Sequence, residues 1–313
     1  MINVGLVGGR GYVGEELLVI LDRHPQFDVT FVGSSSLAGQ SVNQNLDKSI
    51  QSDLIFESLD PTSMRKRGVD VWILAQSNGQ AANWVTQLAE KNTRFLDISY
   101  DFRFNLAWVY GLPERFRHQI LHASRVSNPG CYATAVQLAL LPLRSYLDAP
   151  AIAFGISGYS GAGKTPSERN NTELLANNII PYSLIGHGHE REISHHLGHP
   201  IHFMPHVAPF FRGISVTISA TLLDSFKFSD MQIEDLYRDF YRDAEFVDIQ
   251  SEVPQIRAVA CTNRAIIGGF QFDPAQKRLI TVCVLDNLLK GAASQAVQNL
   301  NLMFGLPESL GLV

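Results

Sequence analysis

The stretch of residues 4–18, VGLVGGRGYVGEELL, decides the fold class of this chain. It begins with an apolar run that suits a buried strand of a parallel sheet, and it ends in the apolar face of a helix. Between these parts lie Gly8, Gly11 and Gly14, spaced G-x-x-G-x-x-G. Glycines in this setting permit a tight turn and let the backbone approach a pyrophosphate at the helix N-terminus. The stretch therefore predicts a dinucleotide site with contacts from Gly8, Gly11, Tyr12, Val13 and Gly14.

The residues beyond this turn extend it into an α/β fold. Short apolar runs, VDVWILAQ and RFLDIS, alternate with the helical stretch GQAANWVTQLAEK up to about residue 128. This alternation is typical of a doubly wound parallel sheet. Alternating strands at 213–223 and 278–285 follow later, and they predict an α+β catalytic domain with a mainly antiparallel sheet. One face of that sheet is expected to pack on helices, and the other face is a candidate subunit interface.

The serines after the second predicted strand bear on the choice of cofactor. An NAD-preferring site usually has Asp or Glu about 20 residues beyond the glycines, where it holds the ribose 2′-hydroxyl. This chain has only hydroxyl groups there, which can donate to a 2′-phosphate. The pattern favours NADP over NAD, although no arginine lies directly beside the serines, which are Ser34, Ser35 and Ser36.

Composition narrows the class of protein. The 313 residues are 45% hydrophobic and 18% charged, as in a globular protein with a sizeable core, and the net charge of −5 gives no basic footprint for nucleic acid. No apolar run approaches the ~18 residues that would cross a membrane. The N-terminus leaves no room for a signal peptide, and three widely spaced cysteines predict reduced thiols. We therefore expect a cytoplasmic protein without membrane or nucleic-acid partners.

One of the three cysteines has the setting of a nucleophile. Cys131 follows SNPG and opens an apolar helical run. A helix N-terminus stabilises thiolate, and the same N–H groups can hold an oxyanion when the thiolate attacks a carbonyl. Cys261 and Cys283 are interpreted as packing residues. A nicotinamide domain joined to an activated cysteine suggests that acyl phosphate becomes a thioester, which hydride reduces to an aldehyde.

Such chemistry needs a proton shuttle, and histidine is the usual one at neutral pH. Seven of ten histidines lie between His187 and His206. The stretch HEREI begins like a zinc-binding H-E-x-x-H motif, but isoleucine replaces its second histidine, so we expect no metal site. Flanking glycines favour His187 or His189 for catalysis, and the residues alone leave that choice open.

These stretches together resemble the N-acetyl-gamma-glutamyl-phosphate reductase family, relatives of aspartate-semialdehyde dehydrogenase. The resemblance runs nearly end to end and rests on GLVGGRGYVGEELL, LDISYDFRF, YGLPE, SNPGCYATA, SGYSGAGK, MPHVAPFFRGI and LDNLLKGAASQAVQNLNLMFG. It implies NADPH-dependent reduction of N-acetyl-gamma-glutamyl phosphate to the semialdehyde, with phosphate release, by a homodimer or homotetramer. It also implies that residues 286–313 return to the first domain (1–128), leaving 129–285 as the catalytic and oligomerisation domain.

The resemblance also assigns residues. It implies that Cys131 is the nucleophile and that His187, or else His189, is the acid/base, with Asn287 near the nicotinamide. The implied substrate contacts are Asn128, Ser157, Gly158, Gly161 and Arg212. Residues 158–165, GYSGAGKT, fit the phosphate-loop pattern G-x-x-x-x-G-K-[ST], but the resemblance makes this segment a catalytic-domain loop. The match is therefore interpreted as accidental.

Three other functions remain open at this stage. Two are enzymes of related chemistry: the reductase of a carrier-bound aminoadipyl phosphate in lysine synthesis, and aspartate-semialdehyde dehydrogenase. The third is a non-catalytic NADP-binding sensor, which would keep the glycine loop but would not need a poised thiol. Thiol alkylation separates the sensor from the enzymes, since a reactive Cys131 supports an enzyme.

Overall fold

The computed structural model describes residues 1–312, and these form two compact units. Unit 1 comprises Met1–Pro129 together with the C-terminal residues from Ala292 on, and unit 2 comprises Gly130–Gly291. Residues 286–291, which the resemblance assigns to the cofactor domain, are grouped by their contacts with unit 2. The reason is that the side chains of Asp286 and Asn287 bond to residues of unit 2.

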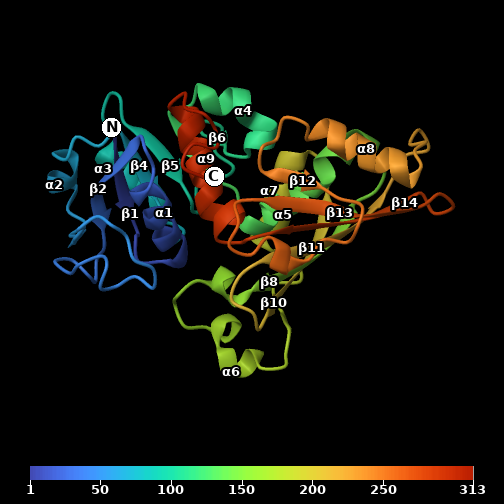
Figure 1. Ribbon diagram of the computed structural model, residues 1–313, viewed down its shortest axis with the longest axis horizontal. Helices are drawn as coiled ribbons and strands as arrows, with labels where there is room; N and C mark the ends of the chain where they lie inside the picture. Colours follow the sequence, from blue (N-terminus) through green and yellow to red (C-terminus); the bar gives the residue numbers. More distant parts are fainter. Residues whose placement is uncertain (313) are drawn as a thin grey trace. The chain divides into compact units, whose positions relative to one another are not determined.

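Unit 1 is built on a seven-stranded sheet in the order β3-β2-β1-β4-β5-β7-β6 (Figure 1). Every neighbouring pair in it is parallel, which confirms the predicted doubly wound sheet. Its central strands, β1, β2, β4 and β5, are four to seven residues long and mostly buried, as expected of a parallel sheet that is covered on both faces. The strands are β1 (Ile2–Val7), β2 (Phe27–Gly33), β3 (Phe56–Glu57), β4 (Val71–Leu74), β5 (Arg94–Asp97), β6 (Val109–Tyr110) and β7 (Arg125–Ser127).

The helices of unit 1 present apolar faces to this sheet. In the first helix, Leu17, Leu18 and Leu21 are fully buried, as their spacing predicts. One core cluster gathers large aromatic residues, among them Phe31 and Trp72 in edge-to-face contact. The helices are α1 (Tyr12–Asp22), α2 (Pro61–Arg65), α3 (Ala81–Leu88), α4 (Pro113–Leu121) and, from the C-terminal residues, α9 (Ser294–Met303).

The strand order of unit 1 contains a switch point of the kind at which doubly wound sheets bind ligands. β1 lies between β2 and β4, so the chain turns to opposite sides of the sheet after β1. Ligands of doubly wound sheets bind outside the carboxyl ends of the strands at such a switch point. The loop between β1 and α1, with its three glycines, lies at this point.

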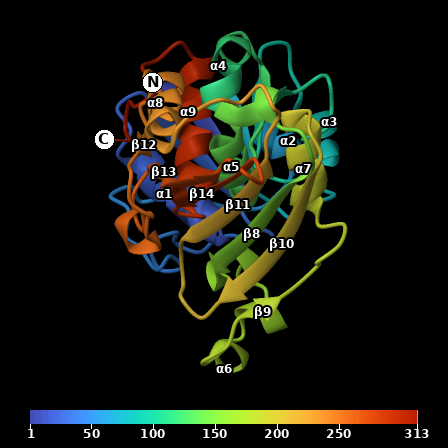
Figure 2. The ribbon, with the colours of Figure 1, turned by 90° about the vertical axis from the view of Figure 1, so that its right-hand side faces the viewer.

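Unit 2 contains a second seven-stranded sheet, in the order β12-β13-β14-β11-β8-β10-β9 (Figure 2). It is mixed and mostly antiparallel, as predicted, and the two strands foreseen from alternation, β11 and β14, are antiparallel neighbours. Two pairs, β8 with β10 and β12 with β13, are parallel. The strands are β8 (Ala151–Gly158), β9 (Ile180–Pro181), β10 (Ile201–Ala208), β11 (Ile214–Thr221), β12 (Val247–Ile249), β13 (Ala265–Asp273) and β14 (Arg278–Leu285).

Helices cover one face of this sheet, since α5 contacts β11 and β14, and α8 contacts β13. The opposite face carries exposed apolar side chains, Ile152 and Phe154, on β8. The helices of unit 2 are α5 (Cys131–Leu140), α6 (Thr172–Leu175), α7 (Gly188–Leu197) and α8 (Asp230–Phe240). The short turns are η1 (Leu141–Tyr146), η2 (Tyr159–Ala162), η3 (Glu168–Asn170), η4 (Ile256–Ala258) and the π-helical turn η5 (Leu289–Ala293). Within residues 1–312, no helix has the length and apolar character needed to cross a lipid bilayer.

Candidate active site

The glycine loop of unit 1 has the local geometry of an anion site. Gly8 has a φ of 91°, which side chains rarely adopt, and a Cβ there would lie 2.6 Å from the carbonyl oxygen of Ala75. A Cβ at Gly14 would lie 2.6 Å from the carbonyl oxygen of Gly8. These two glycines are therefore required by the loop's own packing.

Gly11 differs from the other two glycines of the motif. It precedes the first residue of α1 with φ −71° and ψ 163°, which any residue can adopt. The nearest atom to a Cβ at this position is the Gly8 carbonyl oxygen, at 4.0 Å. Neither the backbone conformation nor the packing of unit 1 demands glycine here. The absence of a side chain keeps the helix N-terminus open, as a bound pyrophosphate would require.

The serines after β2 lie beside the same loop. Ser34 is buried and accepts a hydrogen bond from the Leu37 N–H at 3.2 Å, while Ser35 and Ser36 are exposed. Arg10, an exposed residue of the glycine loop, donates to Ser36 Oγ at 3.0 Å. Sequence reasoning missed this arginine because it is 26 residues away from its partner. The fold thus brings the guanidinium of Arg10 next to the serines, although no arginine is adjacent to them in the sequence.

Cys131 of unit 2 is the first residue of α5 and is partly exposed. The preceding residue, Gly130, donates its N–H to the carboxylate of the fully buried Glu192 at 2.9 Å. On another side, a Cβ at Gly291 would lie 2.9 Å from Cys131 Cβ. The thiol is therefore held at the N-terminus of a buried helix, where partial positive charge favours an anion.

Both candidate histidines lie in one aromatic cluster of unit 2. The ring of His187 is centred 4.9 Å from that of His189 and 5.4 Å from that of Phe203, and His189 is 6.0 Å from Tyr132. His187 caps α7, and its Nδ1 accepts the His189 N–H at 3.1 Å, which leaves Nε2 to carry the proton of the neutral ring. Burial, followed by Arg169, lowers the pKa of His187 against the opposing effects of Glu190 and Glu192.

Two further residues of this cluster were not foreseen. Tyr182 lies 5.5 Å from the His187 ring, and the guanidinium carbon of Arg169 lies 4.9 Å from the Tyr182 ring. Burial and the nearby Cys131 raise the pKa of Tyr182 to about 12, against the lowering effects of Arg169 and Tyr132. Tyr182 thus stays a hydrogen-bond donor at neutral pH. Its position 51 residues after the thiol leaves no pattern in the sequence that would identify it.

The phosphate-loop match does not fold as a phosphate loop. Gly158 ends β8, and residues 159–162 form a 3-10 turn. Lys164 and Thr165 lead only to the three-residue turn η3, whereas a phosphate loop needs a helix that begins there. The segment instead runs beside residues 210–213: Ser160 N–H donates to the Phe211 carbonyl, and Gly158 N–H to that of Gly213.

This pairing brings the predicted substrate residues of unit 2 together. Ser157 is buried, and its hydroxyl donates to the Gly158 carbonyl at 3.0 Å. A Cβ at Gly158 would lie 2.5 Å from the Phe211 carbonyl oxygen, so only glycine lets the two segments approach. A Cβ at Gly161 would lie 3.0 Å from Ser157 Oγ. Arg212 directly follows Phe211, the residue whose close approach these small residues permit. The predicted substrate residues of unit 2 therefore come from two neighbouring segments.

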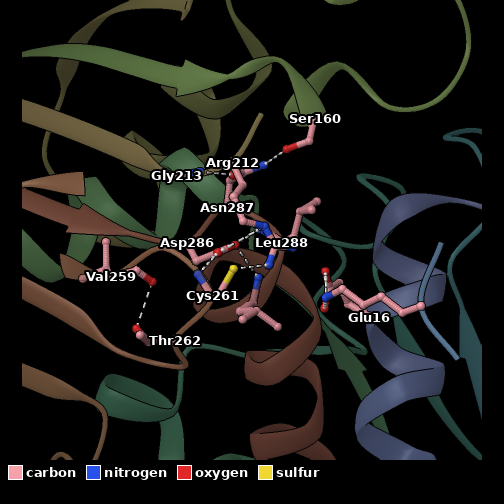
Figure 3. A network of polar contacts seen from close by, with 12 residues as sticks. Glu16, Ser160, Arg212, Gly213, Val259, Cys261, Thr262, Asp286, Asn287 and Leu288 are labelled. Atoms are coloured by element: carbon pink, nitrogen blue, oxygen red, sulfur yellow. Dashed lines mark hydrogen bonds and ion pairs between the residues drawn. The ribbon is translucent and has the colours of Figure 1, made fainter. Parts of the chain in front are cut away.

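A polar network surrounds Arg212 (Figure 3). Its Nε lies 3.4 Å from the carboxylate of Asp286, and its Nη1 donates to Cys261 Sγ at 3.2 Å. The neighbouring Asn287 accepts from the Gly213 N–H at 2.6 Å and donates to Ser160 Oγ at 2.9 Å. Cys261 is exposed, so its interpretation as a packing residue is wrong, whereas Cys283 is fully buried as expected.

Asn128, the remaining predicted substrate contact, is fully buried in unit 1. Its amide donates to the Ala292 carbonyl at 3.2 Å and accepts from Asn299 at 2.9 Å. The buried Arg103, which sequence reasoning missed, donates to the Asn128 carbonyl at 3.0 Å.

Burial raises the pKa of Asp97, at the end of β5, to about 6, while Ser99 and Arg103 act to lower it.

The described residues contain no group of three or more His, Cys, Asp or Glu side chains arranged to hold a metal ion. The histidine-rich stretch is divided instead between α7 and β10. α7 begins at Gly188 and ends before the left-handed Gly198, so the glycines limit the helix to ten residues.

Comparisons with known proteins agree with this architecture. Residues 3–123 match the family model described as the NAD binding domain of semialdehyde dehydrogenase, and residues 131–287 match its dimerisation domain. The chain therefore carries a nicotinamide dinucleotide-binding domain. Among solved structures, aspartate semialdehyde dehydrogenase II from Vibrio cholerae superposes with a TM-score of 0.79 at 19% identity, covering 97% of this chain and 99% of that one. This likeness shows a shared fold.

Curated relatives match more closely. A protein of Xanthomonas campestris pv. campestris (strain B100) is 48% identical over 98% of this chain and 96% of its own length. One of Stenotrophomonas maltophilia (strain R551-3) is 46% identical over 98% of this chain and 96% of its own. Both are named N-acetyl-gamma-glutamyl-phosphate reductase. With similarity of this extent on a thiol-bearing semialdehyde dehydrogenase fold, the chain belongs to the N-acetyl-gamma-glutamyl-phosphate reductase family.

Proposed function

We propose that this protein reduces N-acetyl-gamma-glutamyl phosphate to N-acetylglutamate semialdehyde with NADPH and releases phosphate, a step of arginine synthesis. The observation that carries the proposal is Cys131, a partly exposed thiol at the N-terminus of α5, in the unit that also holds the two-histidine cluster. The names of the curated relatives supply the substrate.

The first step is acyl transfer to Cys131. The thiolate attacks the gamma carbonyl, the tetrahedral oxyanion faces N–H groups at the start of α5, and phosphate leaves as an anion that needs no proton. Tyr182 stays protonated at neutral pH because its pKa is about 12, so its hydroxyl is a further donor close to the thiol. The product of this step is a thioester on Cys131.

The second step releases the aldehyde. The nicotinamide cofactor supplies a hydride when bound. The carbon that receives the hydride develops an alkoxide, which must be stabilised or protonated before the thiolate leaves. His187 suits this task because its neutral form carries the proton on Nε2, and His189 in the same cluster is the alternative. The hemithioacetal hydroxyl then returns its proton to the histidine as the C–S bond breaks, which forms the aldehyde and regenerates the Cys131 thiolate.

Anion recognition is assigned to Arg212. A guanidinium forms paired hydrogen bonds with carboxylate or phosphate, and both groups are present on the substrate. Ser157, Gly158 and Gly161 belong to the segment beside it, and their small size suits the wall of a substrate site. Asn128 acts through the backbone of the stretch that leads to the thiol, because its amide is buried in unit 1.

NADP is proposed as the cofactor on the basis of Arg10 and the serines. The Arg10–Ser36 contact puts a cation and hydroxyl groups together after β2, where an NAD site would have a carboxylate. A 2′-phosphate would replace the protein hydroxyl as the partner of Arg10. The contact of Asn287 with the nicotinamide stays a prediction. So does the assignment of residues 1–128 and 286–313 to NADP binding and of 129–285 to catalysis.

A homo-oligomer, as a dimer or tetramer, is proposed through the open face of the unit 2 sheet. That face carries Ile152 and Phe154, and the matching family model is described as a dimerisation domain. We place the enzyme in the cytoplasm, where its three free cysteines would remain reduced.

The decisive experiment runs the reaction backwards. Phosphate- or arsenate-dependent reduction of NADP⁺ is measured with N-acetylglutamate semialdehyde, aspartate semialdehyde and the aminoadipate analogue. The first substrate should have the highest kcat/KM, and a preference for another would reassign the substrate. Cys131→Ala should abolish both this activity and phosphate release from the acyl phosphate while cofactor binding survives. An undiminished rate in that variant would refute the covalent mechanism.

A further inference from the structure

The carboxylate of Asp286 is a fully buried charge with an unusual set of partners. It accepts backbone N–H groups from Cys261 at 2.7 Å, Leu288 at 2.9 Å and Leu289 at 3.2 Å. Its fourth partner is Arg212, whose Nε lies 3.4 Å away and whose side chain is only 10% exposed. Three backbone donors thus fix the carboxylate, and the carboxylate in turn forms an ion pair with the Nε edge of the guanidinium, although that Nε makes no hydrogen bond within residues 1–312.

Cys261 holds a second point of the same guanidinium. Its sulfur accepts from Arg212 Nη1 at 3.2 Å, while its own N–H donates to Asp286. The three residues therefore form a closed ring of contacts (Figure 3).

The backbone of Cys261 is strained. Its φ is 63°, in the left-handed region that costs a non-glycine residue free energy. Burial does not offset this strain, because the side chain is exposed. A glycine at this position would relieve the strain, but it would lose the contact of the thiol with Arg212.

We propose that Asp286 and Cys261 are positioning residues for Arg212 and determine how tightly the anionic substrate binds. The inference rests on the proposed function, in which Arg212 binds that anion. A guanidinium is a rigid planar fork, so an ion pair at its Nε edge and a hydrogen bond at Nη1 together restrict the direction in which its donors face. An Arg212 held in this way loses less side-chain entropy when the substrate binds.

The test uses four variants: Cys261→Ser, Cys261→Ala, Cys261→Gly and Asp286→Asn. Ala and Gly remove the acceptor, so KM for the anion that Arg212 binds, N-acetylglutamate semialdehyde through its carboxylate or else phosphate, should rise about three- to tenfold, the value of one net hydrogen bond. kcat should stay within about twofold, because the thiol touches no reacting atom. Ser keeps an acceptor at this position and should restore KM to within about twofold of wild type.

The glycine variant separates positioning from structure. Because it relieves the left-handed strain, Cys261→Gly should melt at a higher temperature than wild type while binding substrate less well. If Cys261 had a purely structural role, a variant with a higher melting temperature would not have a higher KM. Asp286→Asn removes the charge but keeps an oxygen acceptor, so it should raise KM more than Cys261→Ala does. If Asp286→Asn fails to fold, the three Cys261 variants still test the proposal.

Variants of Arg212 distinguish this inference from the proposed function. Arg212→Ala should raise KM at least tenfold, and adding Cys261→Ala to it should cause no further increase, because the two residues then act as one unit. If Arg212→Ala leaves KM unchanged both for the semialdehyde and for phosphate, the proposed anion-binding role fails. If Arg212→Ala raises KM but Cys261→Ala and Cys261→Gly leave it unchanged, or if their effect persists in the Arg212→Ala background, the positioning role is overturned.

Discussion

His187 and His189 show how much of the chemistry depends on single atoms. They lie two positions apart, and both rings join the cluster that includes Tyr132. Their backbone settings differ, because His187 caps α7 through Nδ1 whereas His189 lies within the helix. In its neutral form His187 has a defined donor at Nε2, and burial favours that form by lowering its pKa.

This difference makes the two histidines separable by experiment. His187→Asn keeps a capping acceptor for α7 but removes the imidazole, so it should lower kcat by about 10²–10⁴-fold without fraying the helix. Rapid quench should still find the acyl-enzyme, since thioester formation needs no proton on phosphate, and the loss should fall on hydride transfer. A normal rate in this variant, with the defect in His189→Ala, would move the acid/base role to His189.

The glycine loop offers a second test at the residue scale. Gly11→Ala meets no atom closer than 4.0 Å in the protein, so folding should tolerate it, but its Cβ would occupy the opening for the pyrophosphate. We expect at least a tenfold weaker NADPH affinity by fluorescence titration, with little change in melting temperature. Gly14→Ala provides the contrast, since its effect should fall on folding. Its Cβ would clash with the backbone of the loop, so the free energy of unfolding should fall by about 1–3 kcal/mol. Unchanged affinity in Gly11→Ala would contradict the assigned binding mode.

At the scale of elements, the C-terminal residues close over α1. His24, just after α1, faces Asn301 of α9 and the Leu310 carbonyl with Nε2, and its Nδ1 accepts the N–H groups of Gln26 and Phe27. Gly311 has a φ of 75°, and a Cβ there would lie 2.2 Å from the His24 ring. Every contact of His24 uses the neutral ring, with its proton on Nε2.

A pH dependence of stability follows. Burial lowers the pKa of His24 below the ordinary value of 6.5, although its bonds to Leu310 and Asn301 act to raise it. The unfolded chain then binds more protons than the folded chain between the two pKa values, so the free energy of unfolding falls as pH drops below about 6.5. Urea unfolding between pH 5 and pH 8 should show this loss, and His24→Gln should show a shallower slope at lower overall stability. An unchanged slope would exclude His24 as its source.

The elements themselves could be predicted from the sequence because their signals are local. The apolar runs of β1, β4 and β5, and the leucine face of α1, are readable from neighbouring residues. Cys131 was identifiable because SNPG before an apolar helical run defines a helix N-terminus. A local pattern alone was not sufficient, because GYSGAGKT satisfied the phosphate-loop pattern without the helix that gives such a loop its function, and the resemblance of the whole chain was needed to interpret the match as accidental.

Contacts between distant residues could not be predicted in this way. Arg10 meets Ser36 only because β1 and β2 are parallel neighbours, so their following loops share one edge of the sheet. Cys261 meets Arg212 because β11 and β13 both pair with β14. Tyr182 and Arg169 approach the histidine cluster from an irregular segment that has no periodicity to interpret.

At the scale of the whole molecule, the open face of the unit 2 sheet predicts assembly. Ile152 and Phe154 lie opposite Ser219 and Thr217 of β11 and opposite His202 and Met204 of β10. Two exposed apolar side chains on one sheet face suit a self-complementary interface around a two-fold axis. Such an interface would bury both residues.

The double variant Ile152→Asp, Phe154→Asp should therefore reduce the assembly to smaller species. Light scattering coupled to size exclusion would measure the mass, and circular dichroism would check that the sheet still forms. Met231→Asp, at an exposed apolar residue of α8, is the control and should leave the mass unchanged. A wild-type protein that is a monomer at micromolar concentration would remove the proposed oligomer.

Unit 1 is interrupted in the sequence by the whole of unit 2, and this has a consequence for biosynthesis. α9 contacts α1 and α4, and its Asn299 donates to the Gly111 carbonyl at 2.8 Å, so the first 129 residues lack a buried helix until the last ones are made. The whole sequence of unit 2 is therefore made before α9 is made. The unit that begins first along the chain is completed last, whereas domains usually complete in the order of the sequence. A polypeptide cut short before residue 292 would carry a finished thiol-bearing unit and an unfinished dinucleotide-binding one.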